Sequence, residues 1–95
     1  MDKVYIVNWK ETEIDSEGVL STECGTCDYA YLDEDAAILK VADLADGTAD
    51  ECVSELGYPI EEVSVSKNDN GDAQTVSCGS NSYEYWVLEL PVIPN

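Results

Sequence analysis

The chain has 95 residues, of which 44% are hydrophobic, and its 21 acidic residues against four lysines give a formal net charge of −17. The length predicts one domain, residues 1–95, with a modest core, and the hydrophobic content separates the chain from disordered acidic proteins. The charge argues against direct binding to nucleic acid or to anionic membranes and favours a basic partner.

The N-terminal segment passes directly into a strand-like pattern and lacks the apolar core of a signal peptide. No apolar run reaches the roughly 18 residues that a membrane-spanning helix needs. We therefore expect a cytoplasmic protein whose cysteines are reduced.

The first part of the chain is predicted to be extended. Residues 3–9 carry apolar side chains on both faces, which indicates a central strand. Acidic residues then occupy every second position, at Glu11, Glu13, Asp15 and Glu17, and in an extended chain they would share one face about 6.6 Å apart. Residues 15–18 also suit a hairpin loop, which remains the alternative. Short strands are expected at 19–22 and 28–32, on either side of a turn containing Cys24 and Cys27.

Residues 33–56 show the only helical periodicity in the chain. Asp33 is a favourable N-cap, whereas Gly47 is predicted to interrupt the helix before a second one over residues 49–56. The apolar face, predicted to be buried, contains Ala37, Val41, Leu44 and Cys52. The opposite face is predicted to expose a row of carboxylates at Asp35, Asp43, Asp46 and Asp50.

Three further strands are predicted at residues 61–67, 72–78 and 82–90, and Asn70-Gly71 suits a type I′ turn between the first two. The predicted fold is α+β, a mostly antiparallel sheet of four to five strands with one or two helices packed on one face.

The sequence does not point to an enzyme. It has no histidine to serve as the base of a catalytic triad and no arginine to clamp a phosphate. Among 21 acidic residues, nothing singles out a pair with the perturbed pKa values that acid–base catalysis requires.

The four cysteines allow two interpretations. Cys24 and Cys27 have the spacing of a metal-binding pair, and Cys52 and Cys78 would complete a four-thiolate zinc site in a small interaction module. Alternatively, Cys52 and Cys78 fill the core while Cys24 and Cys27 lie in a turn. We favour the second interpretation, without a cofactor, because the later two cysteines are 26 positions apart and form no second C-x-x-C motif.

The charge also has competing explanations. Acidity could serve only the solubility of a halophilic or structural phage protein, although salt-adapted chains generally retain arginine. The two predicted rows of carboxylates instead fit a protein that mimics nucleic acid and occupies a basic cleft. The partner-binding candidates are therefore Glu11, Glu13, Asp15, Glu17, Asp35, Asp43, Asp46 and Asp50.

In size, charge and predicted fold class, this chain without arginine resembles the phage-encoded inhibitors of bacterial defence, including anti-CRISPR proteins that mimic DNA. The resemblance rests on no motif, and no residue roles are carried over. It implies a partner in the host cytoplasm with a channel lined by lysine and arginine, such as a CRISPR effector that holds guide RNA or target DNA.

Overall fold

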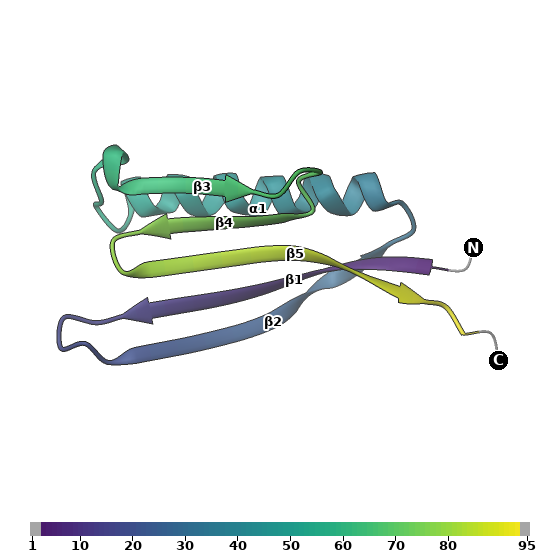
Figure 1. The fold of residues 1–95 in the computed structure, drawn as a ribbon, viewed down its shortest axis with the longest axis horizontal. Coiled ribbons are helices and arrows are strands. Elements are labelled where there is room, and N and C mark those ends of the chain that lie inside the picture. The colour runs from purple at the N-terminus through teal and green to yellow at the C-terminus, as the bar shows by residue number, and fades with distance from the viewer. Residues whose placement is uncertain (1–2, 94–95) are drawn as a thin grey trace.

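The computed structural model describes residues 3–93. Within them, five strands form one antiparallel sheet in the order β2-β1-β5-β4-β3, and a single α-helix packs against one face (Figure 1). The elements follow the chain as β1 (Lys3–Ile14), β2 (Leu20–Tyr31), α1 (Glu34–Ser54), the short 3-10 helix η1 (Ile60–Glu62), β3 (Val63–Lys67), β4 (Ala73–Cys78) and β5 (Asn81–Pro91). This arrangement confirms the predicted α+β class and the interior position of the first strand.

The first acidic row does not lie on one strand. β1 ends at Ile14, and a turn follows in which the Asp15 Oδ1 atom accepts hydrogen bonds from the backbone N–H groups of Glu17 and Val19, both at 2.9 Å. Gly18 completes the turn with a φ of 83°. The hairpin-loop alternative is therefore correct, because the Asp15 carboxylate stabilises the turn.

β2 runs without a break, so the predicted turn at Cys24–Cys27 is wrong. Ile6 pairs with Ala30 and Asn8 with Thr26, so β2 places two extra residues opposite Val7 in a bulge rather than a turn. Within this strand, position 25 has room only for glycine, because the ring of Trp9 lies across it and an added Cβ would stand 2.8 Å from the Trp9 Cζ2 atom.

α1 is one helix, so the predicted interruption at Gly47 is wrong. Asp33 caps its start as expected, because Asp33 Oδ1 accepts a hydrogen bond from the Asp35 N–H at 3.2 Å. Thr48 begins no second helix; its hydroxyl instead pairs with the hydroxyl of Tyr85 on β5. The helix is followed by Gly57, whose φ of 75° allows the chain to turn away.

The loop between β3 and β4 also differs from the predicted type I′ turn. That turn needs positive φ at both central residues, and within residues 3–93 only glycines have positive φ. The turn instead runs from Asn68 to Gly71, and it is closed by a hydrogen bond from the Gly71 N–H to Asn68 O at 3.2 Å. The Asn68 N–H in turn donates to Ala73 O at 3.1 Å, which makes the whole loop wider than a two-residue turn.

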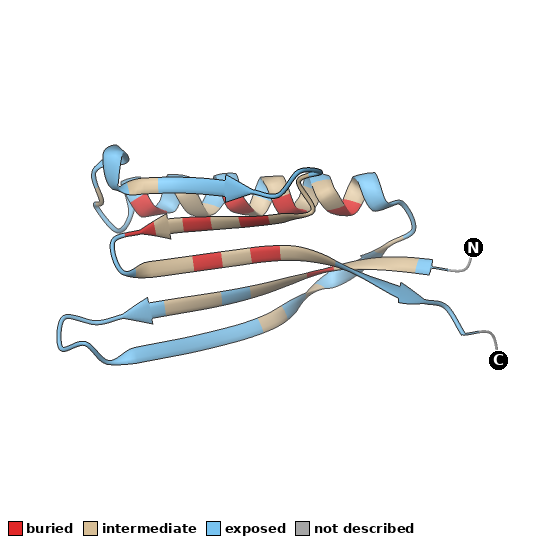
Figure 2. Ribbon diagram, in the orientation of Figure 1, coloured by how far each residue is buried: buried red, intermediate tan, exposed pale blue. Residues whose placement is uncertain are grey.

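The core lies between α1 and the middle of the sheet (Figure 2). The helix contributes Ala37, Val41, Ala45 and Cys52, and the sheet contributes Val7, Val76, Cys78, Tyr83 and Tyr85. The predicted apolar face is thus confirmed except that Leu44 is half-buried, since it lines a surface hollow beside Trp9 and Cys27. Ile6 and Trp86 lie on the opposite face of the sheet, which no described helix covers.

The molecule is elongated. Its principal-axis extents are 50 × 24 × 21 Å, and its radius of gyration of 15.0 Å exceeds the value of about 12 Å expected for a compact chain of this length. Much of the extension comes from the β1–β2 hairpin, whose turn end is exposed (Figure 2). Among residues 3–93, no helix has both the length and the apolar character needed to cross a bilayer.

Candidate functional site

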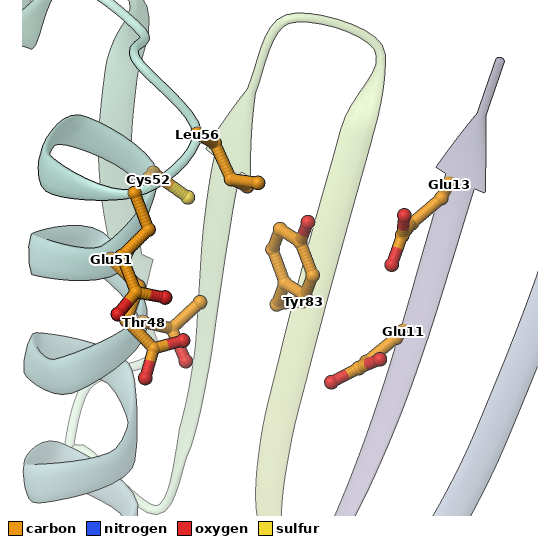
Figure 3. A pocket seen from close by; sticks show the side chains of 8 residues that line it. Glu11, Glu13, Thr48, Glu51, Cys52, Leu56 and Tyr83 are labelled. Carbon is orange, nitrogen blue, oxygen red and sulfur yellow. The ribbon is translucent and has the colours of Figure 1, made fainter.

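A cleft of about 210 Å³ opens between the C-terminal half of α1 and strands β1 and β5 (Figure 3). We call it the acidic cleft. Its lining comprises Glu11, Glu13, Thr48, Glu51, Cys52, Glu55, Leu56 and Tyr83. Four carboxylates therefore border one hollow, and the groups that separate them are mainly apolar or uncharged.

The positions of these carboxylates follow from the fold. Glu11 and Glu13 are two residues apart on β1 and so lie on the same face of the sheet. Glu51 and Glu55 are four residues apart near the end of α1, about one helical turn from each other. Tyr83 forms the floor because it pairs with Glu11 in the β1–β5 register.

Glu11 is in the least favourable electrostatic position of this group. Burial, followed by the charges of Glu13, Glu23 and Glu51, raises the pKa of Glu11 above its usual value. Glu23 takes part because it lies directly opposite Glu11 in the β1–β2 pairing. Like charges at such a position destabilise a sheet, so the cleft favours any ligand that brings positive charge.

The same surroundings raise the pKa values of two tyrosines on β5, Tyr83 and Tyr85. Burial, reinforced by Glu13, raises the pKa of Tyr83 to about 12. Burial also raises the pKa of Tyr85, although the hydrogen bond with Thr48 acts in the opposite direction. Both phenols therefore stay neutral near pH 7, and Tyr83 presents an uncharged ring and hydroxyl to the cleft.

A second acidic surface lies on the outer face of α1, and we call it the helix stripe. It consists of Asp35, Asp43, Asp46 and Asp50, all of which are exposed as predicted. The stripe spans about 22 Å, at about 1.5 Å per helical residue. Leu39 lies among these aspartates with its side chain 66% exposed, which is unusual for a large apolar residue on such a charged face.

Lysines neutralise few of these acids. The one salt bridge found among residues 3–93 joins Lys3 to Glu89 at 2.8 Å, on strands β1 and β5. It involves neither the acidic cleft nor the helix stripe. The carboxylates of both surfaces are therefore available to an external cation.

The structure separates the eight predicted binding residues into three groups. Glu11 and Glu13 line the acidic cleft, the four aspartates form the helix stripe, and Asp15 and Glu17 lie in the β1–β2 turn. The sequence patterns did not reveal Glu23, Glu51, Glu55 and Tyr83. The four-residue spacing of Glu51 and Glu55 beside the apolar Cys52 could have indicated two carboxylates at the border of the buried helix face. That these carboxylates lie near Glu11 and Glu13 depends on the order of the strands, which the sequence does not show.

The cysteines do not gather at one place. Cys24 lies on the sheet face that carries Asn8 and Trp86, whereas Cys27 packs toward the helix side beside Leu44. Two residues three apart on a strand are separated by roughly 10 Å, too far to grip one metal ion. Within the described chain, no group of three or more Cys, Asp or Glu side chains is arranged to hold a metal.

Comparisons with protein-family models, with curated proteins and with solved structures find no match for this chain. We therefore infer its function from the shape, the charge and the two acidic surfaces.

Proposed function

We propose that this chain is a non-enzymatic inhibitor that mimics nucleic acid and blocks the basic nucleic-acid-binding cleft of a host defence protein, such as a CRISPR effector. A phage would encode such a protein, and it would act in the cytoplasm of the host cell. Its carboxylates would pair with the lysines and arginines that otherwise hold phosphates.

The observation that carries this proposal is the density of charge along a narrow body. Residues 3–93 contain 20 acidic side chains and four lysines, and their net charge of −16 over the 50 Å long axis is one negative charge per about 3 Å. Duplex DNA carries one per about 1.7 Å of its axis, and one of its strands carries one per about 3.4 Å. Per unit of length, the chain thus carries about the charge of one DNA strand and a little over half that of the duplex, with a cross-section of 24 × 21 Å.

The arrangement of the carboxylates in the helix stripe also supports this function. It presents its carboxylates in a row on a rigid element, which holds them in place without the entropy cost of ordering a loop. Leu39, exposed within the row, supplies apolar area that a basic cleft could exclude from water. Acidity that served only solubility would require neither a row nor an apolar residue within it.

The test uses a protein partner and a DNA competitor. Immobilised chain captures proteins from a bacterial lysate, and each captured protein is purified and loaded with a fluorescent DNA duplex. We expect the chain to displace the duplex, with an inhibition constant that weakens at least tenfold between about 50 and 200 mM salt.

Three matched variants separate local arrangement from total charge. The first changes Asp43, Asp46 and Asp50 to Asn, and the second changes Glu11, Glu13 and Glu51 to Gln. The control carries E61Q, E62Q and D69N, which remove the same charge from exposed positions outside both surfaces. At least one of the first two should inhibit tenfold less than the control. Equal inhibition by all three, or capture of no nucleic-acid-binding protein, would overturn the proposal.

A further inference from the structure

Two cysteines from distant parts of the chain meet in the core. The Sγ atoms of Cys52 on α1 and Cys78 on β4 are 3.0 Å apart, and the residues are only 1% and 0% exposed. A disulfide bond is about 2.05 Å long, so closing the gap requires a movement of about 1 Å. Both residues are free thiols in this structure.

The fold selects this pair from the alternatives. Four cysteines allow three pairings into two disulfides. Cys24 and Cys27 face opposite sides of the sheet, so they do not pair with each other. Cys27 shares the helix side with the buried pair, but β1 and β5 lie between its strand β2 and β4, which places it roughly 14 Å from Cys78 across the sheet. Cys52 lies near the end of the apolar face of α1 and Cys78 is the last residue of β4, so helix packing alone brings the two sulfurs together.

We propose that Cys52 and Cys78 form an intramolecular disulfide when the protein meets a small, uncharged peroxide. Cys52 lines the acidic cleft, and this cleft of about 210 Å³ opens to solvent and so gives a small oxidant a way toward the pair. The glutamates around this route disfavour anionic oxidants such as glutathione disulfide, whereas hydrogen peroxide is neutral and small.

The reaction balances with one peroxide molecule. The Cys52 sulfur attacks one peroxide oxygen as a thiolate, the O–O bond breaks, and the products are a sulfenic acid at Cys52 and hydroxide. The second sulfur then attacks the sulfenic sulfur, the S–O bond breaks, and the S–S bond forms as hydroxide leaves. The two protons released by the thiols convert both hydroxides to water. Two thiols are oxidised to one disulfide while one peroxide is reduced to two waters.

The surroundings favour Cys52 as the sulfur that reacts first, because Cys52 lines the acidic cleft. Burial, followed by the contact with Cys52, raises the pKa of Cys78 to about 12, so Cys78 is a poor first nucleophile near pH 7 and takes part in the second step. Once formed, the bond would link the end of α1 to β4 and close a loop of 26 positions that includes β3. Such a cross-link stabilises mainly by restricting the unfolded chain.

The experiment treats the folded parent protein with hydrogen peroxide, blocks the remaining thiols and cleaves the chain with a glutamate-specific protease. We expect mass spectrometry to find one linked pair of peptides containing Cys52 and Cys78, lighter by two hydrogens than the reduced pair. The melting temperature should rise by roughly 10 °C or more and return to its starting value with a reductant.

A variant with C24S and C27S should give the same cross-link and the same rise in melting temperature. A C52A variant should show neither. Because the peptide map is made on the parent protein, it does not depend on how well the variants fold. Oxidised protein in which Cys52 and Cys78 remain unlinked, or in which either is joined to Cys24 or Cys27, would overturn the proposal.

Discussion

The negative charge of Glu11 destabilises the folded state. Its folded-state pKa lies above the ordinary value of 4.5, because burial and three neighbouring carboxylates disfavour its charge. The folded state therefore binds the proton more tightly than the unfolded state does. The stability that this tighter proton binding by Glu11 contributes is fully present below the unfolded pKa, and it is lost as the pH rises through the folded pKa.

We therefore expect E11Q to raise the melting temperature at pH 7 and to give no gain near pH 4, where the parent side chain is itself protonated. Thermal unfolding followed by circular dichroism at several pH values measures this. The control is E61Q, which removes an exposed carboxylate from η1. A gain no larger than that of E61Q at pH 7 would show that carboxylate crowding at Glu11 has no energetic effect.

The residues that could be predicted from the sequence are those whose partners are close in the chain. Asp33 caps α1 and Asp15 stabilises its turn through hydrogen bonds to groups two to four residues away. The neighbours of Glu11 come instead from β2 and α1, because strand pairing brings Glu23 opposite it and helix packing brings Glu51 near. No local pattern contains that information.

Among the elements, α1 departs from its prediction by continuing through Gly47. Gly47 favours the end of a helix because glycine costs up to about 1 kcal/mol there relative to alanine. The helix continues through it because Ala45 and Cys52, on either side, are both buried against the sheet. Packing of the whole apolar face outweighs one unfavourable residue.

We expect G47A to increase the free energy of unfolding by about 1 kcal/mol, because an added Cβ at Gly47 meets no atom within 4 Å. Urea denaturation measures this change. The matched control is G57A, which should destabilise because Gly57 has a φ of 75°. A loss of stability in G47A would mean that helix propensity does not limit α1 at this position.

β2 shows a second limit of prediction from sequence. The C-G-T-C segment has the composition of a turn, but the ring of Trp9 needs the space that Gly25 leaves open. The glycine is thus a packing requirement across two strands. The pairing of residues 16 positions apart cannot be inferred from local composition.

At the scale of the whole molecule, repulsion among the acidic side chains opposes folding. With a net charge of −17 and one described salt bridge, the folded state concentrates like charges that the unfolded chain would separate. Salt screens such repulsion, with a screening length that shortens from about 10 Å at 0.1 M to about 3 Å at 1 M.

We therefore expect the melting temperature to rise when sodium chloride increases from about 0.05 to 0.5 M. Differential scanning calorimetry measures the shift, and the triple variant D43N/D46N/D50N should show a smaller rise than the parent. A melting temperature that stays flat or falls would contradict a fold limited by repulsion.

Over residues 3–93 the sheet has two unpaired edges, and this gives the charge another role. β2 and β3 each have a strand partner on one side only, so their outer backbone N–H and C=O groups can pair with another chain. β2 is 12 residues long and carries exposed Leu20 and Tyr29, and the exposed Val19 directly precedes it. With a net charge of −17 on each chain, mutual repulsion should keep two such edges apart, so we expect the acidity that would draw a basic partner also to oppose fibrous self-association.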